Sequence, residues 1–193
     1  MEGLSVILPV RHPEPYLNLL CTQISEVLES ARIKHEILTQ EEDGLTAAVV
    51  EGVGKSRFVN IAVMDADGSH SPIYLVNMYK LMSIYDVVVG SKFIDENPIY
   101  RRFFSFIFRM IAKLMLGLNV IDPMSGYVMG QRRVFEKISP SLDIKFVLQI
   151  LASKPKVKEI PIKFFKRKMG KSHITPITGL RIFKTIFDLW LKS

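Results

Sequence analysis

Two aspartates one residue apart follow a short apolar run and could bind a divalent cation together. The run is Val59–Met64, and Asp65-Ala66-Asp67 follows it directly, before Gly68 breaks the pattern. Hard cations such as Mg²⁺ and Mn²⁺ prefer oxygen ligands and commonly bridge one or two carboxylates to the phosphates of a substrate. The pair therefore indicates a site for a cation and a diphosphate. The alternative is a polar loop in which Asp67-Gly68 forms a simple turn.

The apolar run before the aspartates predicts a buried strand, because strands covered on both faces of a parallel sheet are almost continuously apolar. Ligands of open α/β sheets bind at the carboxyl ends of such strands, which is where the aspartates would lie. Further strands are predicted at 5–10, 35–39 and 85–90, and helices at 16–31, 45–53 and 72–82. Strands that alternate with helices predict an α/β fold with a mostly parallel sheet flanked by helices.

Two segments of the second half are unusually apolar for helices of a small domain. Residues 100–118 are apolar around more than one helical face, and residues 179–193 are amphipathic, with Trp190 close to basic side chains. Helices of this kind are either buried or seated against lipid. We expect both segments to face a membrane surface, and the alternative for 179–193 is packing on the domain or on a partner subunit.

The remaining second half is expected to hold a loop, a helix and a strand. Residues 119–130 read as a loop and 139–153 as a helix. Residues 157–165 alternate like a strand, and Pro161 indicates an edge or irregular strand, because proline cannot donate to a central ladder.

The composition limits the class of protein. With 193 residues, 48% of them hydrophobic, the chain is expected to form one domain. The net charge is +7, concentrated after residue 90 among Phe, Ile, Leu and Met, which favours a membrane surface over nucleic acid. A basic nucleic-acid-binding α/β protein remains an alternative. The single cysteine, Cys21, excludes an internal disulfide and fits a reducing compartment.

Four motifs in a fixed order resemble a known family. They are SVILPV at 5–10, VMDADGSHSP at 63–72, the segment from VVVGSKF at 87–93 to DPMSGY at 122–127, and KEIPIKFFKRKMGKSH at 158–173. Together they resemble family 2 glycosyltransferases of the GT-A (Rossmann-like) fold, and most of all the dolichol- and polyprenyl-phosphate mannose synthases. The resemblance implies one domain over 1–193, with a nucleotide and metal half at 1–99 and an acceptor and membrane-facing half at 100–193.

The resemblance also implies an activity and its participants. The reaction would be metal-dependent transfer of a sugar from a GDP- or UDP-sugar to a polyprenyl phosphate, with Mg²⁺ or Mn²⁺ as cofactor. The protein would be cytoplasmic and peripheral on the cytoplasmic face of a membrane, with no nucleic-acid partner, and a homo-oligomer is left open. A phosphate acceptor is already an anion, so no dedicated general base is required.

Residue roles follow from the same resemblance. The implied metal ligands are Asp65, Asp67 and Ser69. The implied donor contacts are Pro9, Arg11, Glu14, Asp65, Ala66 and Asp67. The implied contacts to the acceptor phosphate are Ser105, Ser125, Arg167, Ser172 and His173. The implied catalytic residues are Asp67, Lys92, Arg101, Asp122 and Arg167.

The nucleotide-binding half departs from the family pattern. The first loop reads Pro9-Val10-Arg11-His12-Pro13, where the family has Pro-Thr-x-Asn-Glu, and Glu14 comes one position late. The acidic turn 40–44 leads straight into the helix before the metal strand, so this half is shortened. The alternative function is therefore a catalytically impaired, glycosyltransferase-like binding or regulatory protein at the membrane surface.

Overall fold

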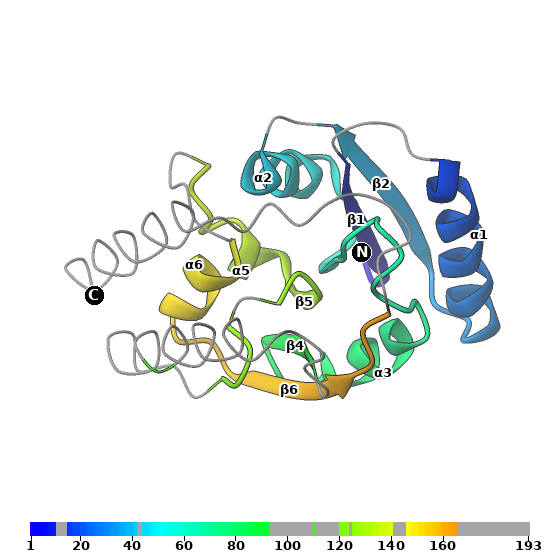
Figure 1. The fold of residues 1–193 in the computed structure, drawn as a ribbon. Coiled ribbons are helices and arrows are strands. Elements are labelled where there is room, and N and C mark those ends of the chain that lie inside the picture. The colour runs from blue at the N-terminus through cyan, green and yellow to red at the C-terminus, as the bar shows by residue number, and fades with distance from the viewer. Residues whose placement is uncertain are drawn as a thin grey trace, which may run out of the picture.

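Within the described residues, the strands pair into one six-stranded sheet with the order β2-β1-β3-β5-β4-β6 (Figure 1). This computed structural model describes residues 1–10, 15–41, 44–92, 110, 120–123, 125–140 and 146–165. The strands are β1 (Leu4–Val10), β2 (His35–Glu41), β3 (Asn60–Val63), β4 (Val87–Lys92), β5 (Val128–Gln131) and β6 (Val157–Ile162). The pairs β1–β2, β1–β3 and β4–β6 are parallel, and β5 is antiparallel to both β3 and β4. The expected mostly parallel sheet is confirmed.

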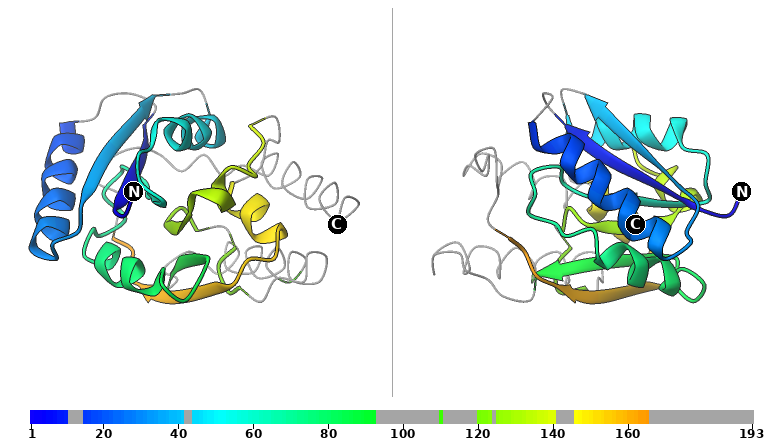
Figure 2. Two further views of the ribbon diagram at one scale, coloured as in Figure 1. Left: turned by 180° about the vertical axis from the view of Figure 1, so that it is seen from behind. Right: turned by 90° about the vertical axis from the view of Figure 1, so that its right-hand side faces the viewer.

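Helices cover both faces of the sheet. The described helices are α1 (Pro15–Ser30), α2 (Leu45–Lys55), α3 (Tyr74–Leu81), α5 (Arg132–Phe135) and α6 (Phe146–Ala152). Successive side chains of a strand point to opposite faces, and in β3 Ile61 and Val63 join one buried cluster while Ala62 joins the other. The first cluster includes residues of α2, α5 and α6, and the second includes residues of α1 and α3 (Figures 1 and 2). The sheet is therefore the middle of three layers.

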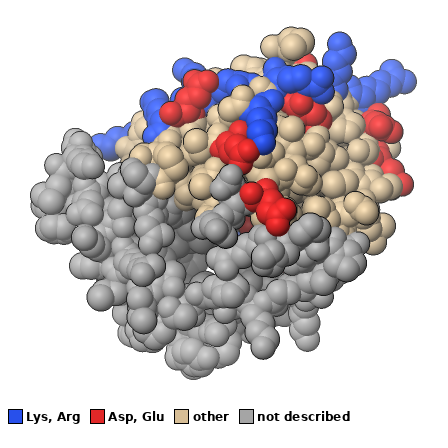
Figure 3. Space-filling model, turned by 90° about the horizontal axis from the view of Figure 1, so that it is seen from above, with Lys and Arg blue, Asp and Glu red and all other residues tan. Residues whose placement is uncertain are grey.

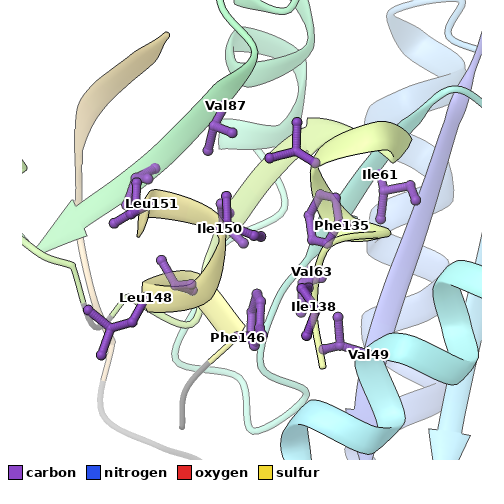
Figure 4. Close-up of a cluster of buried hydrophobic side chains, with 14 of the residues drawn as sticks. Val49, Ile61, Val63, Val87, Phe135, Ile138, Phe146, Leu148, Ile150 and Leu151 are labelled. Atoms are coloured by element: carbon purple, nitrogen blue, oxygen red, sulfur yellow. The ribbon is translucent and has the colours of Figure 1, made fainter. Parts of the chain in front are cut away.

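Aromatic and aliphatic side chains fill the space between the sheet and the α2, α5 and α6 layer. Figure 4 shows Phe135 of α5 between Ile61 of the sheet and Ile150 of α6, and Phe146 of α6 belongs to the same cluster. All four are almost completely inaccessible to solvent. Burial of such side chains stabilises a fold by about 1.5–3 kcal/mol each. The same cluster includes Ile61 and Val63 of β3, so it packs against the strand that leads to Asp65 and Asp67.

Two local expectations were wrong. Residues 128–130 belong to β5, although the whole range 119–130 was expected to be a loop. Gln40 and Glu41 were expected in an acidic turn, yet they extend β2 and pair with Pro9 and Val10. Both corrections have the same physical reason. Each short segment is a strand because its backbone hydrogen-bonds to neighbouring strands, and its own sequence pattern does not show this. The edge position expected for the strand that contains Pro161 is confirmed, since β6 ends the sheet order.

The segments expected to face a membrane are 100–118 and 179–193. Residues 100–118, except Met110, and residues 179–193 lie outside the described residues. Among the helices that the structure describes, none is both long and apolar enough to cross a membrane. On the face drawn in Figure 3, Lys and Arg side chains lie beside Asp and Glu side chains. The described residues carry nearly equal numbers of basic and acidic side chains, so most of the basic surplus lies outside them.

The close packing of α2 on β1 gives a prediction for stability. A Cβ at Gly52 would lie 2.7 Å from Ile7 Cγ2 and 2.9 Å from Ile7 Cδ1, whereas a Cβ at Gly54 would meet nothing within 4 Å. Gly52→Ala is expected to destabilise the fold by about 1–3 kcal/mol through overpacking. Gly54→Ala, in the same helix, is expected to be neutral or to stabilise by up to about 1 kcal/mol. Urea unfolding of both variants measures the difference, and equal stabilities would contradict this packing.

Candidate functional site

The two aspartates lie at the carboxyl end of β3 in a tight turn. The amide of Met64 donates to the Ile7 carbonyl at 3.2 Å, so the pairing with β1 continues to the residue before Asp65. Gly68 has a φ of 78°, which glycine adopts without steric cost. The Ser69 amide donates to Asp67 Oδ1 at 2.9 Å, as in an Asx turn. The polar turn is therefore present, and it holds Asp67 beside the end of the strand.

His70 lies beneath this turn and holds Asp65. The Asp65 amide donates to His70 Nδ1 at 3.0 Å, so the neutral ring carries its proton on Nε2. That nitrogen is 3.9 Å from Asp65 Oδ2, and the His70 side chain is fully buried while that of Asp65 is about one-third exposed, at 32%. The ring stacks on Tyr127 with centroids 5.0 Å apart and meets Phe164 edge to face at 4.8 Å.

The loop that leads into β5 contacts the carboxylate of Asp65. A Cβ built at Gly126 would lie 2.7 Å from Asp65 Oδ2 and 2.8 Å from Oδ1, so any larger residue would require the carboxylate or the loop to move. The preceding hydroxyl, Ser125 Oγ, donates to the Gly90 carbonyl at 2.6 Å and accepts from the Tyr127 amide at 3.1 Å. These bonds attach the loop to β4 and place its backbone against Asp65.

The hydroxyl of Ser125 is thus engaged inside the protein. Ser125 is buried, and Tyr127 beside it is fully buried with its hydroxyl donating to the Ser71 carbonyl at 3.2 Å. Burial raises the pKa of Tyr127 well above its usual value, so this phenol stays protonated. In this structure Ser125 positions the loop, and a direct contact between its hydroxyl and an acceptor phosphate stays a prediction.

The chain after β6 joins the same edge of the sheet. The Phe165 amide donates to the Ser69 carbonyl at 3.0 Å, which ties the end of β6 to the aspartate turn. Lys92, the last residue of β4, places its ammonium 5.8 Å from the centre of the Phe164 ring, within the range of a cation–π contact. Lys92 and the aspartate turn are therefore linked through Phe164, Phe165 and His70.

The remaining predicted residues fall into two groups. Pro9 follows the Ile7–Val63 pair by two residues, as Asp65 does, so both lie at the same end of the sheet. Ala66 is buried, and Asp122 donates its amide to Glu159 Oε1 at 2.9 Å. The following predicted site residues lie outside the described residues: Arg11, Glu14, Arg101, Ser105, Arg167, Ser172 and His173.

Asp65 and Asp67 fit a magnesium-type cation that completes its shell with substrate oxygens. Mg²⁺ keeps several waters and is usually bound through one or two carboxylates plus substrate phosphates. Within the described residues, no three His, Cys, Asp or Glu side chains are grouped to hold a metal. The carboxylate oxygens of Asp65 and Asp67 are of the ligand type that such a cation takes.

Sequence reasoning did not assign roles to His70, Gly126 or Glu159. His70 and Gly126 each stand in a motif that contains predicted residues, VMDADGSHSP and DPMSGY. Glu159 stands in the KEIPIKF stretch, which belongs to the strand expected at 157–165 and to the fourth motif, at 158–173. The available signal was their place in the motifs, and their contacts became visible only in three dimensions.

A mostly parallel sheet between two helical layers, with carboxylates at its carboxyl edge, defines an α/β protein whose site lies where ligands of such open sheets usually bind. Residues 21–139 match the family model described as Glycosyl transferase family 2. This chain therefore belongs to glycosyl transferase family 2, as the motifs predicted.

Two relatives resemble the chain over most of its length. The dolichol-phosphate mannosyltransferase of Saccharomyces cerevisiae is 26% identical over 172 residues, which are 80% of this chain and 64% of that protein. The undecaprenyl-phosphate mannosyltransferase of Micrococcus luteus is 28% identical over 159 residues, which are 73% of this chain and 65% of that protein. The chain thus spans just under two thirds of the length of these relatives.

A solved structure shares the fold. The glucosyl-3-phosphoglycerate synthase from Mycobacterium tuberculosis, in complex with Mn²⁺, uridine diphosphate and phosphoglyceric acid, matches with a TM-score of 0.70. The match covers 98% of this chain and 78% of that one, at 11% identity. This similarity confirms the expected GT-A type of fold.

Proposed function

We propose that this chain transfers a sugar from a nucleotide diphosphate sugar to a polyprenyl phosphate, with Mg²⁺ or Mn²⁺ as cofactor. The observation that carries the proposal is the contact between the Asp65 carboxylate and the Gly126 backbone. It joins the motif for the donor diphosphate to the loop expected near the acceptor. Membership of glycosyl transferase family 2 and the names of the two relatives support the same donor and acceptor classes.

On the donor side, Asp65 and Asp67 would hold the cation, with Ser69 beside it. When bound, such a cation stabilises the negative charge that develops on the leaving diphosphate. The Mn²⁺ and uridine diphosphate bound to the mycobacterial synthase support this assignment. Pro9, Arg11, Glu14 and Ala66 would complete the donor site, and whether the base is uracil or guanine is left to experiment.

On the acceptor side, an oxygen of the polyprenyl phosphate attacks the anomeric carbon of the donor sugar. The new bond joins this carbon to the acceptor oxygen, and the bond to the diphosphate breaks, with its electron pair leaving on the diphosphate. The attacking phosphate is an anion, so no proton has to be removed. Cationic side chains would orient it in line with the leaving group, which is a large part of such catalysis. These are Lys92, Arg101 and Arg167, with Asp122 as a further catalytic residue and Ser105, Ser125, Ser172 and His173 as phosphate contacts.

We further propose one domain over 1–193 that sits on the cytoplasmic face of a membrane through 100–118 and 179–193. The concentration of the basic surplus after residue 90 supports this, because anionic lipid attracts Lys and Arg. A polyprenyl phosphate is embedded in a membrane, so an enzyme that uses it has to reach that surface. The same proposal includes no nucleic-acid partner and leaves a homo-oligomer open.

Calorimetry with UDP- and GDP-sugars in the presence of Mn²⁺ tests the donor half. One of the two nucleotide series is expected to bind with a Kd between about 1 μM and 1 mM, the usual range for enzyme substrates. Transfer to a short-chain polyprenyl phosphate, followed with radiolabelled sugar, then tests turnover. Binding without transfer would favour the impaired, regulatory alternative. No binding of any donor would reject the proposed activity.

A further inference from the structure

One carboxylate on the edge strand β6 accepts three hydrogen bonds from two other segments. Glu159 Oε1 accepts from the Asp122 amide at 2.9 Å and from the Ser91 hydroxyl. Its other oxygen, Oε2, accepts from the Ile121 amide at 2.7 Å. Hydrogen bonds to an ionised acceptor are roughly twice as strong as neutral ones. The Glu159 carboxylate therefore fixes two successive backbone amides of the loop before β5.

The two segments that Glu159 holds both carry proposed site residues. Asp122 is bound through its own amide, and Ser91 directly precedes Lys92. Glu159 itself is anchored, because β6 pairs with β4 along its whole length and Val89 lies opposite Glu159. The carboxylate therefore connects Asp122 to the end of β4 with little freedom of its own.

The other end of this loop is attached to the same strand. The Ser125 amide donates to the Asp122 carbonyl at 3.2 Å, and the Ser125 hydroxyl binds the Gly90 carbonyl. The next residue, Gly126, contacts the Asp65 carboxylate. Asp122 thus lies between two attachments to β4, and the loop ends against the aspartate that would hold the cation.

We propose that Glu159 is a positioning residue: its carboxylate sets Asp122 and Lys92 relative to Asp65 for sugar transfer. The inference rests on the proposed function for its catalytic consequence, whereas the ordering of the loop is independent of any activity. The exposed amide of Ile121 would otherwise exchange with water, since that residue is 68% exposed and belongs to no described helix or strand.

Amide hydrogen exchange in the intact chain without ligands tests the ordering of the loop. In Glu159→Gln, an NH₂ group replaces one carboxylate oxygen and cannot accept a hydrogen bond. At most one side-chain oxygen then remains to accept from Ser91, Ile121 and Asp122. The amides of Ile121 and Asp122 are expected to exchange about 10- to 100-fold faster than in the wild type, as the loss of bonds to a charged acceptor implies. The matched control is Glu136→Gln, an exposed glutamate of the same half of the chain, which should leave both amides unchanged.

Kinetics with donor and acceptor test the positioning role. Glu159→Gln is expected to lower kcat by about 10- to 100-fold, the effect of a small misplacement of catalytic groups. The Kd for nucleotide and Mn²⁺ should stay unchanged, because Asp65, Asp67 and Gly126 are retained. A general loss of stability would instead lower the fraction of folded protein, and both nucleotide binding and sugar transfer would then decrease together. A shorter variant, Glu159→Asp, keeps the charge and should give intermediate values, which provides a second test if the glutamine variant does not fold.

The outcomes separate this inference from the proposed function. Unchanged exchange at Ile121 and Asp122 in folded Glu159→Gln overturns the inference, whatever the wild-type activity. Faster exchange with an unchanged kcat and KM overturns the catalytic part of the positioning role. A wild-type chain that transfers no sugar refutes the proposed function, while the exchange experiment still decides whether Glu159 orders the loop.

Discussion

Replacing Asp67 with asparagine is expected to abolish Mn²⁺-dependent nucleotide binding. Asparagine keeps a side-chain oxygen that can accept from the Ser69 amide, so the turn itself should persist. It removes the negative charge that a hard cation requires. Loss of a group that merely supports a metal ligand typically costs about 10- to 100-fold in metal affinity, and loss of a ligand should cost at least as much. Calorimetry with the donor nucleotide and Mn²⁺ measures the change.

The control for this variant is an exposed carboxylate far along the chain from the turn. Glu29 lies exposed on α1, and Glu29→Gln removes the same unit of charge. It should bind nucleotide and Mn²⁺ as the wild type does. If Asp67→Asn also binds as the wild type does, the aspartate turn is a structural turn and the metal assignment is wrong.

Replacing Gly126 with alanine is expected to weaken the same binding without touching a charged residue. The new Cβ would lie within 3 Å of both Asp65 carboxylate oxygens, so either the carboxylate or the loop has to move. A misplacement of about 1 Å can reduce catalysis by about 100-fold. We expect a loss of similar size in sugar transfer, accompanied by a higher Kd for nucleotide and Mn²⁺.

The Gly126 variant separates crowding from backbone strain. Positive φ values among the described glycines occur at Gly3 and Gly68, so the expected effect at Gly126 is purely steric. Gly54→Ala, with open space around the added methyl group, is the matched control and should bind normally. Normal binding by a folded Gly126→Ala protein would contradict the proposed contact between the two loops.

The sheet could be predicted where burial leaves a continuous apolar pattern. The strands β1, β3 and β4 are covered on both faces, and their sequences show it without reference to any other segment. The strand β5 was not predicted, because its four residues follow the turn-forming Ser125-Gly126 and include Gly130. Its ladder comes from β3 and β4, and that pairing cannot be read from a local pattern.

The candidate site likewise has a part that could be predicted from the sequence and a part that could not. Asp65 and Asp67 could be predicted, because their meaning depends on a strand end next to them in the sequence. The supporting contacts could not, since Gly126 reaches Asp65 and Glu159 reaches Asp122 across long separations in the chain. Spacing along a sequence carries no information about which distant carboxylate accepts from which amide. The engaged hydroxyl of Ser125 likewise became visible only through its partner, Gly90.

The antiparallel strand β5 also determines when during synthesis the site can form. Ribosomes release a chain from its N-terminus, and the strands β1 to β4 all precede β5. Until β5 emerges, the inner edges of β3 and β4 have no partner strand between them, and unpaired edges invite association with other chains. The pairing of Asn60 with Gln131 closes this gap, and the same step brings Gly126 to Asp65. A nascent chain therefore holds its aspartate motif early but completes the site only late, together with the protection of its sheet.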